Sequence, residues 1–164
     1  MKSLIKFIIE NNSSYTIEDI SVYDVIKRIS KGDYNIIKSH IEEAEELDDD
    51  YDILYLNGRN TSKNVYTNIE KNSKYKWIAL KNNNKEVAIQ LLKFESKDNI
   101  ELVIAERSKK AKDEHETFKK ILDAVIEKYN PKEIHTFALA DKLKDKYMKY
   151  GFKSDNEDQL TLKL

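Results

Sequence analysis

Apolar residues recur along this chain at two spacings, and together they predict a fold that mixes helices and strands. Segments in which apolar residues alternate or run together predict strands at 3–9, 75–80, 86–94, 100–105, 134–139 and 160–164. Segments in which they follow the i, i+3, i+4, i+7 rule, or that lie between a cap and a stop residue, predict helices at 21–32, 33–44, 113–130 and 141–150.

Side chains that cap helices set the expected starts of three of these helices. Ser21 and Asp24 have the spacing of a capping box, in which each side chain bonds the other residue's backbone amide. We expect Asp33 to cap the second helix. Asp113 and Glu116 have the same capping-box spacing, so the third helix is predicted to begin near Asp113.

Polar turns indicate how the strands pair. Asparagines at 82–84 separate two apolar runs and tolerate the positive φ of a tight turn, which predicts a hairpin. A second polar turn at 97–99 adds the next strand, so three consecutive strands form an antiparallel meander. The almost wholly apolar run 134–139 predicts a central strand parallel to the strand at 100–105. We place Trp77 in the core.

Length and composition exclude several classes of function. With 164 residues the chain fits a single domain, 1–164. Lys and Arg number 29 against 30 Asp and Glu, so no overall field attracts nucleic acid or an anionic membrane. The absence of cysteine excludes disulfides, thiolate zinc sites and a cysteine nucleophile, and it is typical of a cytoplasmic protein. No apolar run approaches the roughly 20 residues of a membrane span.

Acidic residues, tyrosines and histidines supply weaker candidates for a site. The acidic run at 42–50 could attract a cation, but it lacks a calcium-loop pattern, so we favour a solvated helix end. Tyr55 and Tyr66 are candidate pocket residues, for which ordinary packing is favoured. His40 and His115 have no partner at ligand spacing, and His135 is interpreted as a satisfied core or edge histidine. We predict no metal site.

A meander, a strand-helix-strand unit, a short helix, Gly-Phe and a final strand follow one another in residues 75–164. This order resembles the GNAT superfamily of acyl-CoA-dependent N-acetyltransferases. Tyr147, Gly151 and Phe152 resemble the family's Tyr-x-x-x-Gly-Phe ending. The resemblance implies an α/β (α+β) fold of three layers, in which helices flank a central mixed, largely antiparallel sheet.

The resemblance also implies where acetyl-CoA, the expected co-substrate, would bind. In such proteins the sheet splays open after the fourth strand, and the pantetheine arm binds the exposed strand edge. Here that edge comprises Leu102, Val103, Ile104 and Ala105. The pyrophosphate would sit at the start of the following helix, where free amides and the helix dipole favour anions.

Two residues match positions at which the family places its acid and base. Tyr147 matches the general acid that protonates the departing thiolate, with ordinary packing as an equal alternative. Glu101 resembles the base that some members place at the start of the splayed strand, and the alternative is an exposed strand carboxylate.

The loop that should bind the pyrophosphate departs from the family pattern. It reads Arg107-Ser108-Lys109-Lys110-Ala111-Lys112, with Lys110 and Lys112 where two small residues belong. In one account Arg107, Lys109, Lys110 and Lys112 bind phosphate as point charges. In the other, the loop has lost CoA and its lysines are solvated. Asp113 adds a negative charge that would repel phosphate.

Two functions follow from these observations. The first is an acyl-CoA-dependent N-acetyltransferase that acts on an amine of unknown identity. The alternative is a catalytically inactive GNAT-fold protein that binds a partner protein or peptide. We rank nucleic-acid binding well behind, because the lysines of the last helix alternate with acids and suit a solvated face. A membrane partner is not expected, and a homodimer is left open.

Overall fold

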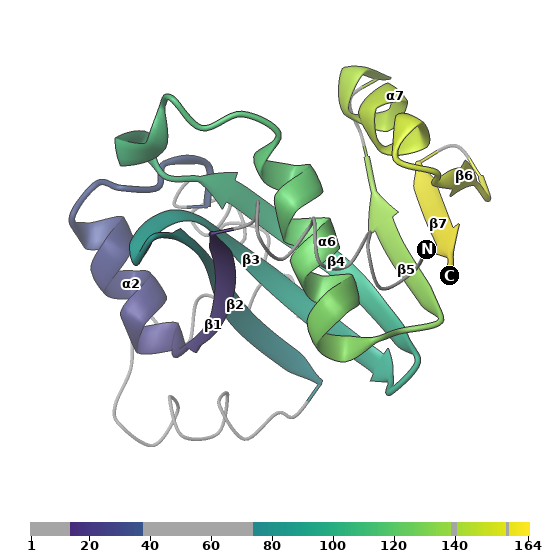
Figure 1. Ribbon diagram of the computed structural model, residues 1–164, viewed down its shortest axis with the longest axis horizontal. Helices are drawn as coiled ribbons and strands as arrows, with labels where there is room; N and C mark the ends of the chain where they lie inside the picture. Colours follow the sequence, from purple (N-terminus) through teal and green to yellow (C-terminus); the bar gives the residue numbers. More distant parts are fainter. Residues whose placement is uncertain (1–13, 38–73, 139–140, 157) are drawn as a thin grey trace, which may run out of the picture.

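The computed structural model describes residues 14–37, 74–138, 141–156 and 158–164 (Figure 1). The predicted strand at 3–9, the acidic run at 42–50, His40, Tyr55 and Tyr66 lie outside these residues. The described elements are β1 (Tyr15–Ile20), α2 (Val22–Ser30), β2 (Tyr75–Asn82), β3 (Lys85–Ser96), β4 (Asn99–Arg107), η1 (Lys109–Ala111), α6 (Thr117–Tyr129), β5 (Glu133–Phe137), α7 (Asp141–Lys149), β6 (Lys153–Ser154) and β7 (Gln159–Lys163).

The described strands form one seven-stranded sheet in the order β1-β2-β3-β4-β5-β7-β6. Every pair is antiparallel except β4 with β5, so the predicted meander and parallel pair are confirmed. Asn83 and Asn84 turn the β2–β3 hairpin with φ of 50° and 67°. The sequence analysis missed β1, because this edge strand is largely exposed and lacks a clear apolar alternation.

Helices cover both faces of the sheet, which confirms the three-layer fold. On one face α6 and α7 bury a core with β2 to β5 and β7, and Ile121, Leu122 and Ile134 belong to it. On the other face α2 packs against β2 and β3 through Val25 and Trp77. Figure 1 shows α6 running across the sheet and α7 beyond β5.

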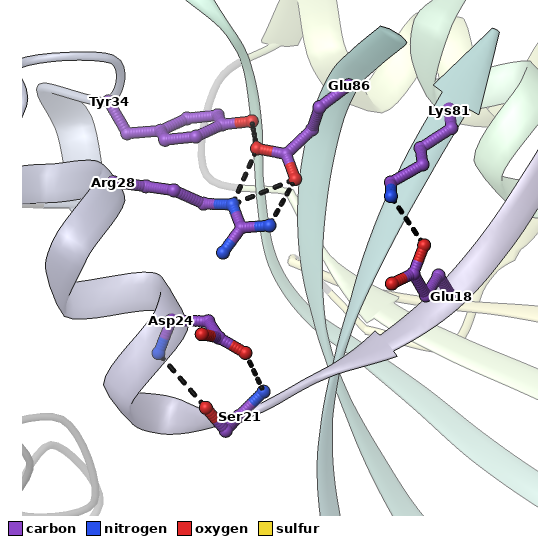
Figure 2. Close-up of polar contacts among 7 residues, drawn as sticks. All are labelled: Glu18, Ser21, Asp24, Arg28, Tyr34, Lys81 and Glu86. Carbon is purple, nitrogen blue, oxygen red and sulfur yellow. Dashed lines mark hydrogen bonds and ion pairs between the residues drawn. The ribbon is translucent and has the colours of Figure 1, made fainter. Parts of the chain in front are cut away.

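The start of α2 is the capping box that the sequence predicted. The Asp24 amide donates to Ser21 Oγ at 3.0 Å, and the Ser21 amide donates to Asp24 Oδ2 at 3.2 Å (Figure 2). The helix ends before Gly32, whose φ of +80° fits the expected left-handed position.

The predicted cap at Asp33 is wrong, because a carboxylate from the sheet performs that task. The amides of residues 35–37 donate to Glu106 at 2.9, 2.8 and 3.1 Å. Glu106 stands near the end of β4 and is buried. Asp33 instead binds η1: its carbonyl accepts the Lys109 amide at 3.1 Å, and its carboxylate pairs with Lys110 Nζ at 3.3 Å.

A half-buried ion pair joins α2 to the sheet. Arg28 Nε donates to both carboxylate oxygens of Glu86, at 2.8 and 2.7 Å, and Tyr34 Oη donates to the same carboxylate at 3.0 Å (Figure 2). Burial raises the pKa of Tyr34, and the charge of Glu86 adds to this effect. Because Tyr34 and Asp33 are neighbours, this network also fixes the position of η1 beside α2.

The predicted start of α6 near Asp113 is also wrong. The helix begins at Thr117, and Glu116 precedes it with φ of +55° and no side-chain capping bond. The chain first forms η1, which the Ser108 side chain caps. Residues 112–116 then cross from the end of β4 to the start of α6 (Figure 1). The capping-box spacing of Asp113 and Glu116 therefore falls in a connecting segment.

Candidate active site

The strands β4 and β5 separate halfway along β4. They pair only over residues 99–102 of β4, ending with Leu102 opposite Thr136, and then diverge (Figure 1). Beyond this point β4 pairs with β3 alone among the described strands. Leu92 pairs with Leu102 and Leu91 with Ile104, so Val103 is a β-bulge. The splayed edge that the sequence analysis expected at 102–105 therefore begins one residue later, at Val103.

Tyr147 lies where the two strands separate. Its hydroxyl lies beside that of Thr136, and Thr136 Oγ1 donates to the Leu102 carbonyl at 3.2 Å. Burial raises the pKa of Tyr147, and the neighbouring Thr136 hydroxyl acts in the opposite sense. The phenol therefore keeps its proton at neutral pH, as a general acid must.

The Tyr-x-x-x-Gly-Phe ending is a Schellman motif that fixes Tyr147. The Phe152 amide donates to the Tyr147 carbonyl at 3.2 Å, and the Gly151 amide donates to the Met148 carbonyl at 3.0 Å. The rings of Tyr147 and Phe152 meet edge to face with centroids 5.2 Å apart. The motif has a structural role that is independent of any chemistry, since it ends α7 and holds the tyrosine in the core.

Glu101 lies on the opposite face of the sheet from Tyr147. Leu102 belongs to the core that contains Tyr147, and adjacent strand residues point to opposite faces. Glu101 pairs in register with Lys93 on β3 and with His135 on β5. Burial raises the pKa of Glu101, although the charge of Lys93 opposes this. A carboxylate with a raised pKa is better matched to proton abstraction near neutral pH.

A cavity of about 510 Å³ opens beside the free edge of β4. Its lining combines two cationic side chains, Arg107 and Lys146, with the start of α6 and with three carboxylates, those of Glu106, Glu114 and Glu116. Thr117, the first residue of α6, lines this cavity and is only 5% exposed. Its hydroxyl has no hydrogen-bond partner among the described residues. Cations, a free hydroxyl and a helix N-terminus together suit an anion.

Acidic residues near this cavity are bound to other side chains. Glu114 accepts hydrogen bonds from the hydroxyl of Tyr15 and from Asn82 Nδ2, the latter at 3.0 Å. Chiefly through the Tyr15 bond, its pKa is lowered. Glu116 accepts from Tyr150 Oη at 3.0 Å. Both carboxylates nevertheless stand at the entrance to α6 and oppose the binding of an anion there.

The lysines of the degraded loop lie apart from this cavity. Arg107 lines it, but Lys109, Lys110 and Lys112 do not. The amides of η1 already donate within the protein, that of Lys110 to Ser108 Oγ at 3.2 Å and that of Ala111 to the Ser108 carbonyl at 3.0 Å. A phosphate at η1 would have to displace these bonds. Thr117 was missed because the start of α6 was predicted four residues too early. Lys146 was missed because it lies on α7 and meets the start of α6 only in three dimensions.

The remaining candidates give little. His135 bonds Thr161 Oγ1 at 2.8 Å, which confirms it as a satisfied strand histidine, and His115 lines the cavity. Within the described part of the chain, no three His, Asp or Glu side chains are grouped as a metal site. In the same residues no helix is long and apolar enough to cross a membrane.

Comparison with known proteins identifies the fold through structure alone. No protein-family model and no curated protein matches the sequence. The spermidine/spermine N-acetyltransferase SpeG of Vibrio cholerae aligns with a TM-score of 0.59 at 10% identity, over 93% of this chain and 95% of its own. The N-acetyltransferase PseH of Campylobacter jejuni aligns with a TM-score of 0.53 at 11% identity, over 92% and 99%.

A third structure, the PaiA N-acetyltransferase of Thermoplasma acidophilum in complex with coenzyme A, aligns with a TM-score of 0.50 at 15% identity. The alignment covers 93% of this chain and all of the PaiA chain. PseH has also been solved with acetyl-coenzyme A. All three neighbours are N-acetyltransferases, and each alignment spans more than nine-tenths of both chains. The chain therefore has the GNAT fold.

Proposed function

We propose that this protein is an acetyl-CoA-dependent N-acetyltransferase that acts on an amine. One observation carries the proposal: a buried phenol, Tyr147, lies beside Thr136 where β4 and β5 separate, and the Schellman motif holds it there. A thioester lying between the separated strands would place its sulfur beside that hydroxyl.

The free edge of β4 supplies the binding site for the pantetheine arm. Its backbone groups on the β5 side face no strand among the described residues, so an extended amide chain can add to the sheet there. This assigns Val103, Ile104 and Ala105 to the arm, with Leu102 at the point of separation.

The cavity at the start of α6 supplies the site for the pyrophosphate. Arg107 and Lys146 offer charge, and the Thr117 hydroxyl and the first amides of α6 offer donors. A second hollow, also of about 510 Å³, shares Lys146 and adds Lys142 and Lys149 from α7. These lysines suit the remaining phosphate of CoA. In this proposal Lys109, Lys110 and Lys112 contribute only long-range charge.

The chemistry needs a base and an acid on the two sides of the thioester. A base on the Glu101 face, either that carboxylate or a water, takes a proton from the substrate ammonium. The freed amine attacks the carbonyl carbon, and the departing thiolate takes a proton from Tyr147. Transfer proceeds directly between bound reactants, so holding them in contact supplies much of the rate enhancement.

Thermal unfolding with and without acetyl-CoA tests the binding step. Acetyl-CoA at a hundred times its dissociation constant should add about 2.7 kcal/mol to the free energy of unfolding. Transfer is then measured as released CoA thiol against spermidine, an amino sugar and a lysine peptide. Because the protein has no cysteine, a thiol reagent reports only CoA. No stabilisation at millimolar acetyl-CoA would overturn the proposal.

Substitution of Tyr147 tests the assignment of the acid. Tyr147→Phe should keep the stabilisation by acetyl-CoA and lower transfer by about a hundredfold or more, because only the proton donor is lost. Tyr23→Phe on α2 is the matched control, since that ring is 51% exposed and far from the described cavity, and it should transfer normally. Unchanged transfer by Tyr147→Phe would remove this residue from the mechanism.

A second candidate function is a GNAT-fold module that binds a protein or peptide without catalysis. Glu114 and Glu116 at the entrance to α6, and the internally bonded amides of η1, favour it. Replacing both acids with Gln decides between the two functions. If they exclude CoA, the double variant should gain stabilisation by acetyl-CoA that the parent protein lacks.

The dodecameric SpeG structure shows that the fold can self-associate, and we expect a homodimer, measurable by sedimentation.

A further inference from the structure

His135 lies beside the point where β4 and β5 separate, and the mechanism proposed above gives it no role. It lies on β5 one residue before the strands separate, opposite Glu101 in the register and on the face away from Tyr147. Its side chain is 18% exposed. Both ring nitrogens have a close neighbour: Nδ1 lies 2.8 Å from Thr161 Oγ1, and Nε2 lies 3.3 Å from Glu133 Oε2.

The order of hydrogen bonds determines which nitrogen of His135 carries the proton. The Thr161 hydroxyl donates to the Asp155 carboxylate, which has no hydrogen of its own to offer. A hydroxyl has only one hydrogen, so Thr161 Oγ1 must accept from His135 Nδ1–H. The neutral ring therefore has its lone pair on Nε2, and any proton that it gains is bound there.

Charged groups surround this ring on each packed element. Glu133 lies on the same strand, Glu101 on β4, and Asp155 beyond the Thr161 hydroxyl. Among the described residues, further charged neighbours on this face are Glu95, Lys93 and, beside Thr161 in the register, Lys153. Carboxylates thus lie on both sides of the imidazole, so a positive charge acquired on Nε2 would be balanced locally.

We propose that His135 Nε2 is the proton acceptor for the substrate ammonium and that Thr161 and Asp155 orient the ring for this task. This inference rests on the proposed acetyltransferase function. Glu101, opposite His135 in the register, then attracts the ammonium by its charge and is not the final base. As in the Ser-His-Asp triad of serine proteases, a carboxylate determines which nitrogen of the histidine carries the proton. Here that carboxylate is Asp155, which acts through the Thr161 hydroxyl.

The proton balance of the step is complete. His135 takes one proton from the ammonium, and the neutral amine forms a bond to the acetyl carbonyl carbon. As the tetrahedral intermediate collapses, the carbon–sulfur bond breaks and Tyr147 protonates the thiolate. The nitrogen loses its second proton, which restores Tyr147, and His135 releases the first proton to solvent.

Nitrogen-detected NMR tests the geometry without any need for activity. The chain has three histidines, so the loss of one signal set in His135→Asn assigns the ring. The parent protein should show the Nδ1–H tautomer at His135. Thr161→Val removes the acceptor and should shift the ring toward Nε2–H. An Nε2–H tautomer in the parent protein would overturn the proposal.

Kinetics test the role in transfer, with acetyl-CoA and whichever of spermidine, amino sugar or lysine peptide the parent protein acetylates fastest. His135→Asn should lower kcat by about a hundredfold and remove the acidic limb of the profile of kcat against pH. Thr161→Val should lower kcat about tenfold, because the ring tautomer is no longer fixed. Glu101→Gln should raise KM and keep the acidic limb. Thr16→Val on the exposed edge strand β1 is the control and should behave as the parent.

The outcomes separate the two proposals. Absence of transfer by the parent protein with any amine would overturn the proposed function and this role with it. Full transfer by His135→Asn, or loss of the acidic limb only in Glu101→Gln, would overturn the role of His135 alone. His135→Gln provides a second variant if the first loses its folded circular-dichroism spectrum.

Discussion

A single buried carboxylate, that of Glu106, holds the chain that follows α2 against the sheet. It accepts three backbone amides, which is an unusual load for one side chain. Hydrogen bonds to a charged acceptor are roughly twice as strong as neutral ones. Because these amides begin a helical turn, the charge also complements the local dipole.

Replacing this carboxylate should therefore be costly. Glu106→Gln leaves one oxygen for three donors and places an NH₂ group against the others, so we expect a loss of about 2–3 kcal/mol in the free energy of unfolding. Urea denaturation measures it. Glu18→Gln is the control, because that carboxylate is 55% exposed and pairs with Lys81 only at the surface (Figure 2). The control should change by less than about 0.5 kcal/mol, and equal losses would contradict the capping role.

Because of Tyr129, at the end of α6, the free energy of unfolding should change with pH in the alkaline range. Burial, aided by the charge of Asp19, raises its pKa to about 12 from the ordinary 10.0. Between these values the unfolded chain releases a proton that the folded protein keeps. Stability therefore falls as pH rises through this window. The free energy of unfolding of Tyr129→Phe, measured by urea denaturation, should fall less steeply between pH 10 and 12 than that of the parent. The variant keeps the edge-to-face contact with Phe94. Parallel slopes for parent and variant would contradict this.

At the scale of elements, the stops of α2 and α7 look alike in sequence but differ in packing. Gly32 and Gly151 both have positive φ, of +80° and +102°. A Cβ on Gly32 would contact none of the described residues within 4 Å, whereas on Gly151 it would lie 3.3 Å from Leu162 Cδ1. Gly151, which ends α7, is therefore packed against the core that contains Tyr147, whereas Gly32, which ends α2, is not packed against any described residue.

This difference predicts unequal effects of the same substitution. Gly32→Ala should cost about 1–2 kcal/mol from backbone strain alone. Gly151→Ala should cost more, because strain and the contact with Leu162 add. It should also lower transfer, since the Schellman motif that holds Tyr147 is disturbed. Urea denaturation and the thiol assay measure the two effects, and equal stability losses would show that the Leu162 contact is relieved without cost.

At the scale of the whole molecule, the sheet is closed at one end of β4 and open at the other. Among the described strands, residues 99–102 are paired on both sides, Val103 is a bulge, and residues 104–107 are paired with β3 only. Amides at 103–107 that point toward β5 should exchange faster with deuterium than those at 99–102. Acetyl-CoA should slow exchange at 103–107 and at the start of α6. Protection confined to η1 would instead place the ligand on the lysines of that segment.

Much of the fold could be predicted from the sequence, because apolar periodicity and asparagine turns are local signals. The hairpin at Asn83 and Asn84, the buried face of α6 and the stop at Gly151 were of this kind. The helix start at Thr117 could not be predicted, since Asp113 offered a stronger capping pattern than the Glu116 that precedes the helix. The capping of residues 35–37 by Glu106 joins segments about seventy positions apart, as the separations of 69 to 71 show.

The site was predicted in part for the same reason. Tyr147 and the β4 edge follow from the order of elements, whereas Thr117 and Lys146 meet only in three dimensions. The relay through His135, Thr161 and Asp155 is likewise not visible in the sequence, because β5 and β7 bring it together.

The unpaired residue Val103 also decides which charge each face of the molecule receives. One additional residue in a strand reverses the alternation of every side chain after it. With the bulge, Glu106 lies opposite Ile89 and faces α2, while Arg107 lies opposite Ala88 and faces α6. Without it, the Glu106 carboxylate would turn away from the amides of residues 35–37, and the guanidinium of Arg107 would turn toward them. The one additional residue, Val103, thus determines which face of the sheet carries the negative charge of Glu106 and which carries the positive charge of Arg107. Deleting Val103 should exchange the two charges between the faces.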